Sequence, residues 1–65
     1  MGSKNHRHYL TKTLNDIRAL NRLVLNGDAS LEHYNLRVKN MLGVVEPAHM
    51  PTVMNEARFY MGTPH

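Results

Sequence analysis

Residues 9–30 read YLTKTLNDIRALNRLVLNGDAS, and this stretch decides the fold. Its apolar residues recur at spacings of three and four, with polar residues between them: Leu10, Leu14, Ile17, Leu20, Leu23 and Val24. That spacing is typical of an amphipathic helix, which we predict over residues 9–25. The next three residues, Asn26-Gly27-Asp28, tolerate a positive φ and favour a helix end with a tight turn. The chain is therefore expected to reverse direction here.

A second helix is predicted to follow this turn. Ser30 is well placed as its N-cap, and Glu32 puts a carboxylate in the first turn, where the helix dipole favours it. Gly43 is the expected C′ residue. Leu36 fits neither face of the helix cleanly, so we place it on a boundary or partner-facing strip. The expected inward face is Leu31, Tyr34, Val38, Met41 and Leu42.

Two prolines, Pro47 and Pro51, oppose a continuous helix through residues 44–51, because each lacks an N–H donor and restrains its predecessor. An extended or one-turn connection is expected there. A third helix is predicted over residues 51–61, ended by Gly62. Its inward stripe would be Val53, Ala57 and Tyr60, widened by Met54 and Met61, with Phe59 turned away.

The 65 residues suit one small domain, and a composition of 42% hydrophobic and 20% charged residues is typical of a folded chain. We predict an all-α three-helix domain over residues 9–62, a helical hairpin with the third helix packed across it. Residues 1–8 lack apolar periodicity and are expected to form a flexible basic arm, with residues 63–65 as a tail.

Several functions are not expected. The absence of cysteine excludes disulfides and thiolate metal sites and favours a reducing, cytoplasmic location. The five histidines are scattered, Ser30 already has a capping role, and there is no glycine-rich phosphate loop. The longest apolar run, residues 23–25, is far too short to cross a bilayer. We therefore predict a protein that is not an enzyme and has no metal, cofactor, small-molecule substrate or membrane span.

Charge is unevenly distributed along the chain. The first 22 residues carry a net charge of +4, with Asp16 as the single acid, whereas the remainder carries −1. A basic segment can lie along phosphates, and a second helix can present side chains to base edges. Nucleic-acid binding is therefore one hypothesis, with five cations as its candidates: Lys4, Arg7 and Lys12 on the first segment, and Arg37 and Lys39 beside Asn35 and Asn40.

Protein binding is the preferred hypothesis. Five methionines in 65 residues supply adaptable apolar surface, and a core this small cannot hide every large apolar residue. Leu10, Leu14, Ile17 and Val24 also fit a heptad seam with Asn21 in a polar slot, which predicts a homodimer through the first helix. The contact candidates are four apolar and three basic residues: Leu36, Met54, Phe59, Met61, Arg18, Arg22 and Arg37.

A leucine-rich helix followed by Gly27, Ser30, Tyr34 and the closing pair Met41-Leu42 resembles the SHOCT motif, a short helical segment usually found at the ends of larger proteins. The resemblance covers residues 20–42, and the family usually has Thr where Ser30 stands. This chain departs from the family pattern at three positions: Ala29 replaces a larger aliphatic residue, His33 an acidic one and Val38 a basic one. The resemblance implies a role in oligomerisation or in contacting a macromolecule, and no catalysis.

Two roles are expected for a small helical binding protein of this kind. It is either a regulator that occludes a larger enzyme, such as a phage-encoded inhibitor of a host system, or a subunit of an assembly. This interpretation rests on size and on the absence of a catalytic pattern, and no residue selects between these roles.

Overall fold

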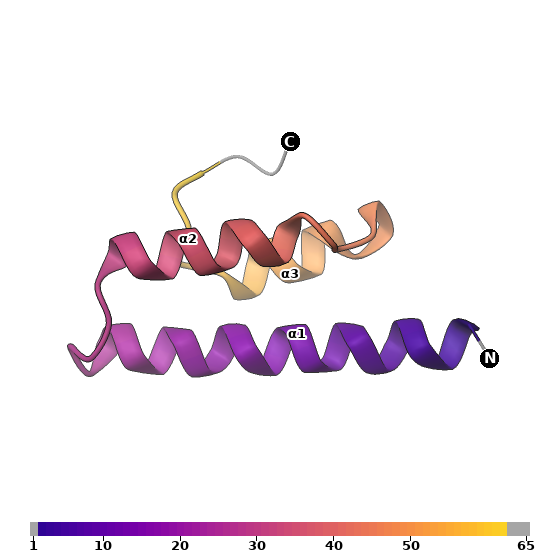
Figure 1. Cartoon of the computed structure of the whole chain (residues 1–65), viewed down its shortest axis with the longest axis horizontal. Helices are drawn as coiled ribbons and strands as arrows, with labels where there is room; N and C mark the ends of the chain where they lie inside the picture. The colour runs from indigo at the N-terminus through magenta and orange to yellow at the C-terminus, as the bar shows by residue number, and fades with distance from the viewer. Residues whose placement is uncertain (1, 63–65) are drawn as a thin grey trace.

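Three α-helices and one short 3₁₀ helix make up the fold (Figure 1). The computed structural model describes the backbone of residues 2–62 and the side chains of residues 9–62. In chain order the helices are α1 (Gly2–Leu25), α2 (Leu31–Leu42), η1 (Pro47–His49) and α3 (Met50–Glu56). The predicted all-α three-helix domain is confirmed, while the predicted tail, residues 63–65, lies outside the described residues.

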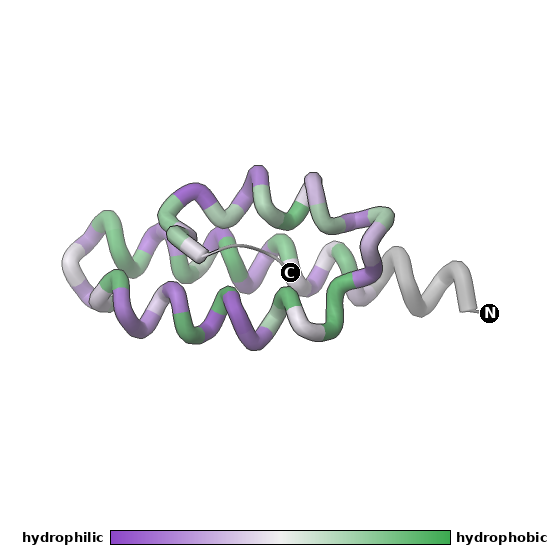
Figure 2. Tube along the Cα trace, turned by 90° about the horizontal axis from the view of Figure 1, so that it is seen from above, coloured by the Kyte–Doolittle hydropathy of each residue, from purple (hydrophilic) through white to green (hydrophobic). Residues whose placement is uncertain are grey.

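Helix α1 is the base on which the other helices pack. It runs beneath α2 and α3, and α2 returns antiparallel to it (Figure 1). Its 24 residues span about 36 Å at 1.5 Å per residue, which accounts for most of the 39 Å length of the molecule. Apolar and polar residues are interspersed along the helices (Figure 2), which is typical of amphipathic helices that bury one face.

The start of α1 differs from the prediction. The helix begins at Gly2 rather than Tyr9, so the backbone of the predicted basic arm is helical. No glycine or proline interrupts residues 3–26, and extending an existing helix gains one hydrogen bond for each residue fixed. Because residues 2–8 contain no apolar residue, hydrophobic periodicity could not reveal this extension.

Local signals set the α1–α2 turn as predicted. Gly27 has a φ of 80°, its N–H donates to the Val24 carbonyl at 3.0 Å, and the Asp28 N–H donates to the Leu23 carbonyl at 2.8 Å. This pair of bonds is a Schellman motif, which satisfies carbonyls at the helix end. On the other side, the Ser30 Oγ accepts the His33 N–H at 3.1 Å and caps α2.

Seven apolar residues from all three α-helices form the buried core: Ile17, Leu20, Tyr34, Val38, Leu42, Val53 and Ala57. Asn21 is buried with them and joins the three helices. Its Nδ2 donates to the Glu56 carbonyl at 3.0 Å, and its Oδ1 accepts the Tyr34 hydroxyl hydrogen. The Tyr34 hydroxyl oxygen in turn accepts the Phe59 N–H at 3.5 Å.

This arrangement changes the interpretation of the predicted heptad seam. Ile17 is fully buried, and Leu10, Leu14 and Val24 pack against the core, so that face of α1 is covered by the other helices of the same chain. Asn21 bonds to Tyr34 and Glu56 instead of meeting its own copy. A homodimer through this seam would require α2 and α3 to move away from α1.

The third helix is shorter than predicted. It ends at Glu56, and Ala57 leaves the helical region with a φ of −83° and a ψ of 65°, so neither Met61 nor Gly62 marks its end. The turn brings the Phe59 ring edge-on to the Tyr34 ring, with centroids 5.6 Å apart. The prediction that Phe59 faces away from the core is therefore wrong, because this packing outweighs another turn of helix.

Two details of α2 also differ from the prediction. Leu31, placed on the inward face, is 47% exposed. Gly43 caps the helix with a right-handed φ of −64° and ψ of −19°, so it does not use the left-handed conformation typical of a C′ glycine. The connection that follows contains a single 3₁₀ turn with Pro47 at its start, as the two prolines indicated.

Candidate functional site

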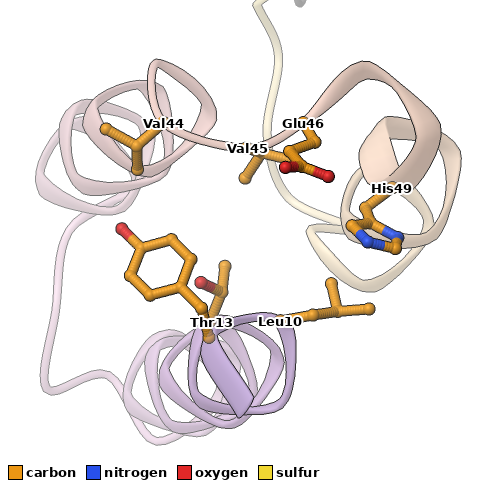
Figure 3. Close-up of a pocket in the computed structure, with 7 residues that line it drawn as sticks. Leu10, Thr13, Val44, Val45, Glu46 and His49 are labelled. Carbon is orange, nitrogen blue, oxygen red and sulfur yellow. The ribbon is translucent and has the colours of Figure 1, made fainter. Parts of the chain in front are cut away.

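An apolar hollow opens between the first half of α1 and the segment that connects α2 to α3 (Figure 3). Its volume is about 300 Å³. Side chains from α1 form one wall, and those from the connection form the other. The lining residues are Tyr9, Leu10, Thr13, Val44, Val45, Glu46 and His49.

The local sequence explains why this hollow exists. After Gly43 the chain leaves the axis of α2, and the N–H groups of Val44 and Val45 donate to the Met41 and Leu42 carbonyls at 3.1 and 3.3 Å. These bonds tighten the end of the helix and hold both valines close to it. Val45 packs against the core, whereas Val44 stays at the rim.

A second hollow of about 300 Å³ adjoins the first and shares Tyr9 and Val44 with it. It lies between α1 and α2, and its lining is more polar: Asp16, Arg37, Asn40 and Met41 complete it. We call the two hollows together the Tyr9–Val44 groove. An apolar pocket with a few convergent polar groups is the usual form of a binding site, because the polar groups fix the orientation of what binds.

Two large apolar side chains at the rim of this groove are exposed to solvent. Tyr9 is 48% exposed and Val44 is 59% exposed, and they flank the point at which the two hollows meet. Exposed apolar groups on both sides of an apolar hollow favour burial under a partner, since covering them removes their surface from water.

The predicted apolar contact residues differ in their exposure to solvent. Leu36 is 58% exposed and Met61 is 81% exposed, whereas Met54 and Phe59 are partly buried against the core. In the protein-binding set, Arg37 is the residue that reaches the groove.

The two other basic candidates lie on α1. The Arg18 Nε is 3.3 Å from the Glu56 Oε1, and its Nη1 donates to the Asn15 Oδ1 at 3.4 Å. Arg22 is exposed and does not line the groove.

The predicted nucleic-acid residues of α2 are split between faces. Arg37 and Lys39 are two positions apart, so they point about 200° apart around the helix. Asn35 donates to the Leu31 carbonyl and accepts the Met61 N–H, both at 2.7 Å, so both ends of its amide are used inside the protein. Lys12 is exposed on α1, and the side chains of Lys4 and Arg7 lie outside the described residues.

The sequence pattern does not mark Tyr9 or Val44 as part of a site. It predicts a helix that begins at Tyr9 and a connection over residues 44–51. The adjacent valines Val44 and Val45 in this proline-flanked segment are the available signal, but only Val44 is left at the surface, because Val45 packs against the core of the same chain.

Within residues 9–62, no group of three histidine or acidic side chains is close enough to hold a metal ion. Burial raises the pKa of the Tyr34 phenol, which lies in the core and not in the groove. Along the described part of the chain, no helix has the length and apolar character needed to cross a membrane.

Comparison with known proteins identifies no relative: no family model, curated protein or solved structure matches this chain. The resemblance of residues 20–42 to the SHOCT motif stays a prediction. The function is therefore argued from the geometry of the surface.

Proposed function

We propose that this protein is a small non-enzymatic docking module that binds a segment of a partner protein in the Tyr9–Val44 groove. One observation carries the proposal: two large apolar side chains, Tyr9 and Val44, are about half exposed at the rim of an apolar hollow of about 300 Å³. Interfaces gain most of their affinity where an anchor side chain fills such a pocket and water is excluded around it.

The chemistry of the groove favours a protein segment as its occupant. The apolar hollow accepts one large aliphatic or aromatic side chain, while Asp16, Arg37 and Asn40 in the adjoining hollow offer both charges and an amide. A peptide supplies these features together, because its anchor side chain and its flanking polar groups are held on one backbone.

A chain of this size acts by covering or positioning a larger protein, which supports a role as a regulator, an inhibitor or an assembly subunit. We include the cytoplasmic location in the proposal because the composition is free of cysteine. Among the contact residues named from the sequence, Arg37 belongs to this groove.

Site-specific photo-cross-linking tests the proposal. A photoreactive phenylalanine analogue is placed at Val44 in one variant and at Leu36 in another. These positions are a matched pair, because the side chains are 59% and 58% exposed and Leu36 lies outside the groove. We expect one partner protein to be captured from position 44 in cells and not from position 36.

Binding measurements on two substituted variants provide a second test. Val44→Asp should abolish binding of the captured partner, and Leu36→Asp should leave it within about twofold, because only the first puts a charge at the rim of the apolar hollow. Circular dichroism checks that both variants keep their helices. Equal capture from both positions, or an adduct of twice the mass of this chain, would contradict the proposal.

A further inference from the structure

The outward face of α1 carries a surface of a different kind from the groove. From Lys12 to Arg22, positions 12, 15, 18, 19 and 22 follow the three- and four-residue spacing of one helix stripe, and all five are exposed. Ile17 and Leu20 on the other side of the helix are buried in the core. We call residues 12, 15, 18, 19 and 22 the α1 stripe.

The α1 stripe is basic and consists of Lys12, Asn15, Arg18, Ala19 and Arg22. The exposed Asp16, one turn after Lys12, borders it and also lines the hollow shared with α2. Glu56 approaches its edge and pairs with the Arg18 Nε at 3.3 Å, and the Arg18 Nη1 donates to Asn15 within the stripe. The same helix begins at Gly2, so Lys4 and Arg7 are also residues of α1.

The composition of the α1 stripe favours phosphate over a protein or lipid surface. Its single apolar residue is Ala19, so it lacks the large anchors that form protein hot spots or insert into a bilayer. Guanidinium, ammonium and amide groups are the donors that nucleic-acid phosphates accept.

The shape favours double-stranded DNA among nucleic acids. Single strands are bound mainly by stacking bases on aromatic rings, and the α1 stripe has no aromatic residue. α1 is a straight rod about 36 Å long, and a B-DNA duplex offers it a closely spaced row of phosphates, with one charge per about 1.7 Å of its axis (Figure 1). Because α2 and α3 cover the opposite face of α1, the α1 stripe lies on the phosphates and does not enter the groove.

We infer that the α1 stripe binds the phosphate backbone of double-stranded DNA, with Lys12 and Arg22 as its principal contacts and Arg18 between them. Lys12 and Arg22 are ten residues apart, about 15 Å along the helix axis, so they contact separate phosphates. No row of base-reading side chains accompanies them, and binding is therefore independent of sequence. This second activity uses a different face from the groove and does not depend on the proposed function.

Fluorescence anisotropy with a labelled 24-base-pair duplex tests the inference. With two or three phosphates neutralised, the affinity should fall roughly 10- to 40-fold between 50 and 200 mM salt. The double variant Lys12→Gln/Arg22→Gln should bind at least about tenfold more weakly at 50 mM salt, with a salt slope smaller by about 2.

The matched control is Arg37→Gln/Lys39→Gln, which removes the same charge from exposed positions of α2 and should keep the affinity within about twofold. Circular dichroism shows whether each variant remains helical, and Val44→Asp should bind DNA normally because it alters only the groove. Equal weakening by both double variants would overturn the inference. So would an absence of duplex binding at 50 mM salt, or binding of poly-glutamate, single-stranded DNA or duplex RNA as tight as that of the DNA duplex.

Discussion

Asn21 is the polar residue on which the three α-helices converge. Its amide satisfies the Tyr34 hydroxyl on α2 and the Glu56 carbonyl on α3, and Tyr34 accepts the Phe59 N–H beyond α3. A buried polar group without a partner costs about 1–3 kcal/mol, so the network favours one arrangement of the helices over others.

Replacing Asn21 with Ala should lower the free energy of unfolding by about 2–3 kcal/mol, because it leaves the Tyr34 hydroxyl and the Glu56 carbonyl without their partner. Asn15→Ala, on the exposed face of α1, should change it by less than about 0.5 kcal/mol. Urea denaturation measures both. In a double-mutant cycle with Tyr34→Phe, strictly additive losses would show that the two side chains are not coupled.

The Tyr34 phenol makes stability depend on alkaline pH. Burial is the largest influence and raises its pKa above the ordinary 10.0, so the unfolded chain loses this proton at a lower pH than the folded chain. The contribution of this group to the free energy of unfolding is fully present below pH 10 and is lost as the pH rises from there through the folded-state pKa. The midpoint of urea unfolding should therefore fall more steeply above pH 10 in the wild type than in Tyr34→Phe. Parallel curves for the two proteins would contradict this assignment.

At the scale of elements, the ends of α1 and α2 are set by local chemistry, and the two glycines at these ends play different parts. Gly27 has a positive φ, and a Cβ added to it would meet no atom within 4 Å, so a substitution there is opposed by the backbone alone. Gly43 has a right-handed conformation that any residue adopts.

Gly27→Ala should therefore lower the free energy of unfolding by about 1 kcal/mol, because alanine is strained in the left-handed region. Gly43→Ala should change the free energy of unfolding by less than about 0.5 kcal/mol. The new Cβ would be in ordinary contact with the Asn40 carbonyl oxygen at 3.4 Å, and alanine lowers the conformational entropy of the unfolded chain. Thermal denaturation of the pair measures the difference. Equal losses would mean that the turn does not need its left-handed residue.

The elements that were predicted correctly are those with signals in their own sequence. Ser30 caps α2 and Gly27 closes α1 through hydrogen bonds to residues at most five positions away. The end of α3 has no such signal. It unwinds because Phe59 packs on Tyr34, which is 25 positions away, and because the Met61 N–H bonds to Asn35.

At the scale of the whole molecule, the face of α1 that suits a coiled coil is occupied by the chain's own helices. Ile17 is completely buried by them, and the partly buried Leu10, Leu14 and Val24 pack around it. The large apolar side chains that remain exposed include Tyr9 and Val44 at the groove, and Leu25, Leu36 and Met61 outside it.

We therefore expect the midpoint of thermal unfolding to stay constant when the protein concentration is varied over a roughly hundredfold range. A protein stabilised by pairing with its own copy would unfold at a higher temperature as its concentration increased. Calorimetry at several concentrations, with sedimentation equilibrium on the same samples, makes the measurement. A rising midpoint together with a doubled mass would show that copies of the chain associate.

The candidate groove could not be predicted because its two sides are distant in the sequence. Tyr9 and Val44 are brought together only when α2 folds back on α1 and the chain leaves its axis at Gly43. Arg37 was identified from its charge, but its place beside Asp16 and Asn40 follows from the packing of α2 on α1.

Apolar spacing, capping residues and glycine act over a few neighbouring positions, so the sequence alone shows that the chain is helical, that it reverses at Gly27 and which charges α1 carries. Which apolar residues stay exposed depends on the tertiary fold: Phe59 packs against the core, α2 and α3 cover the heptad face of α1, and Tyr9 and Val44 lie at the rim of a groove. Distant side chains compete for burial in one small core, and no local pattern records which of them is excluded.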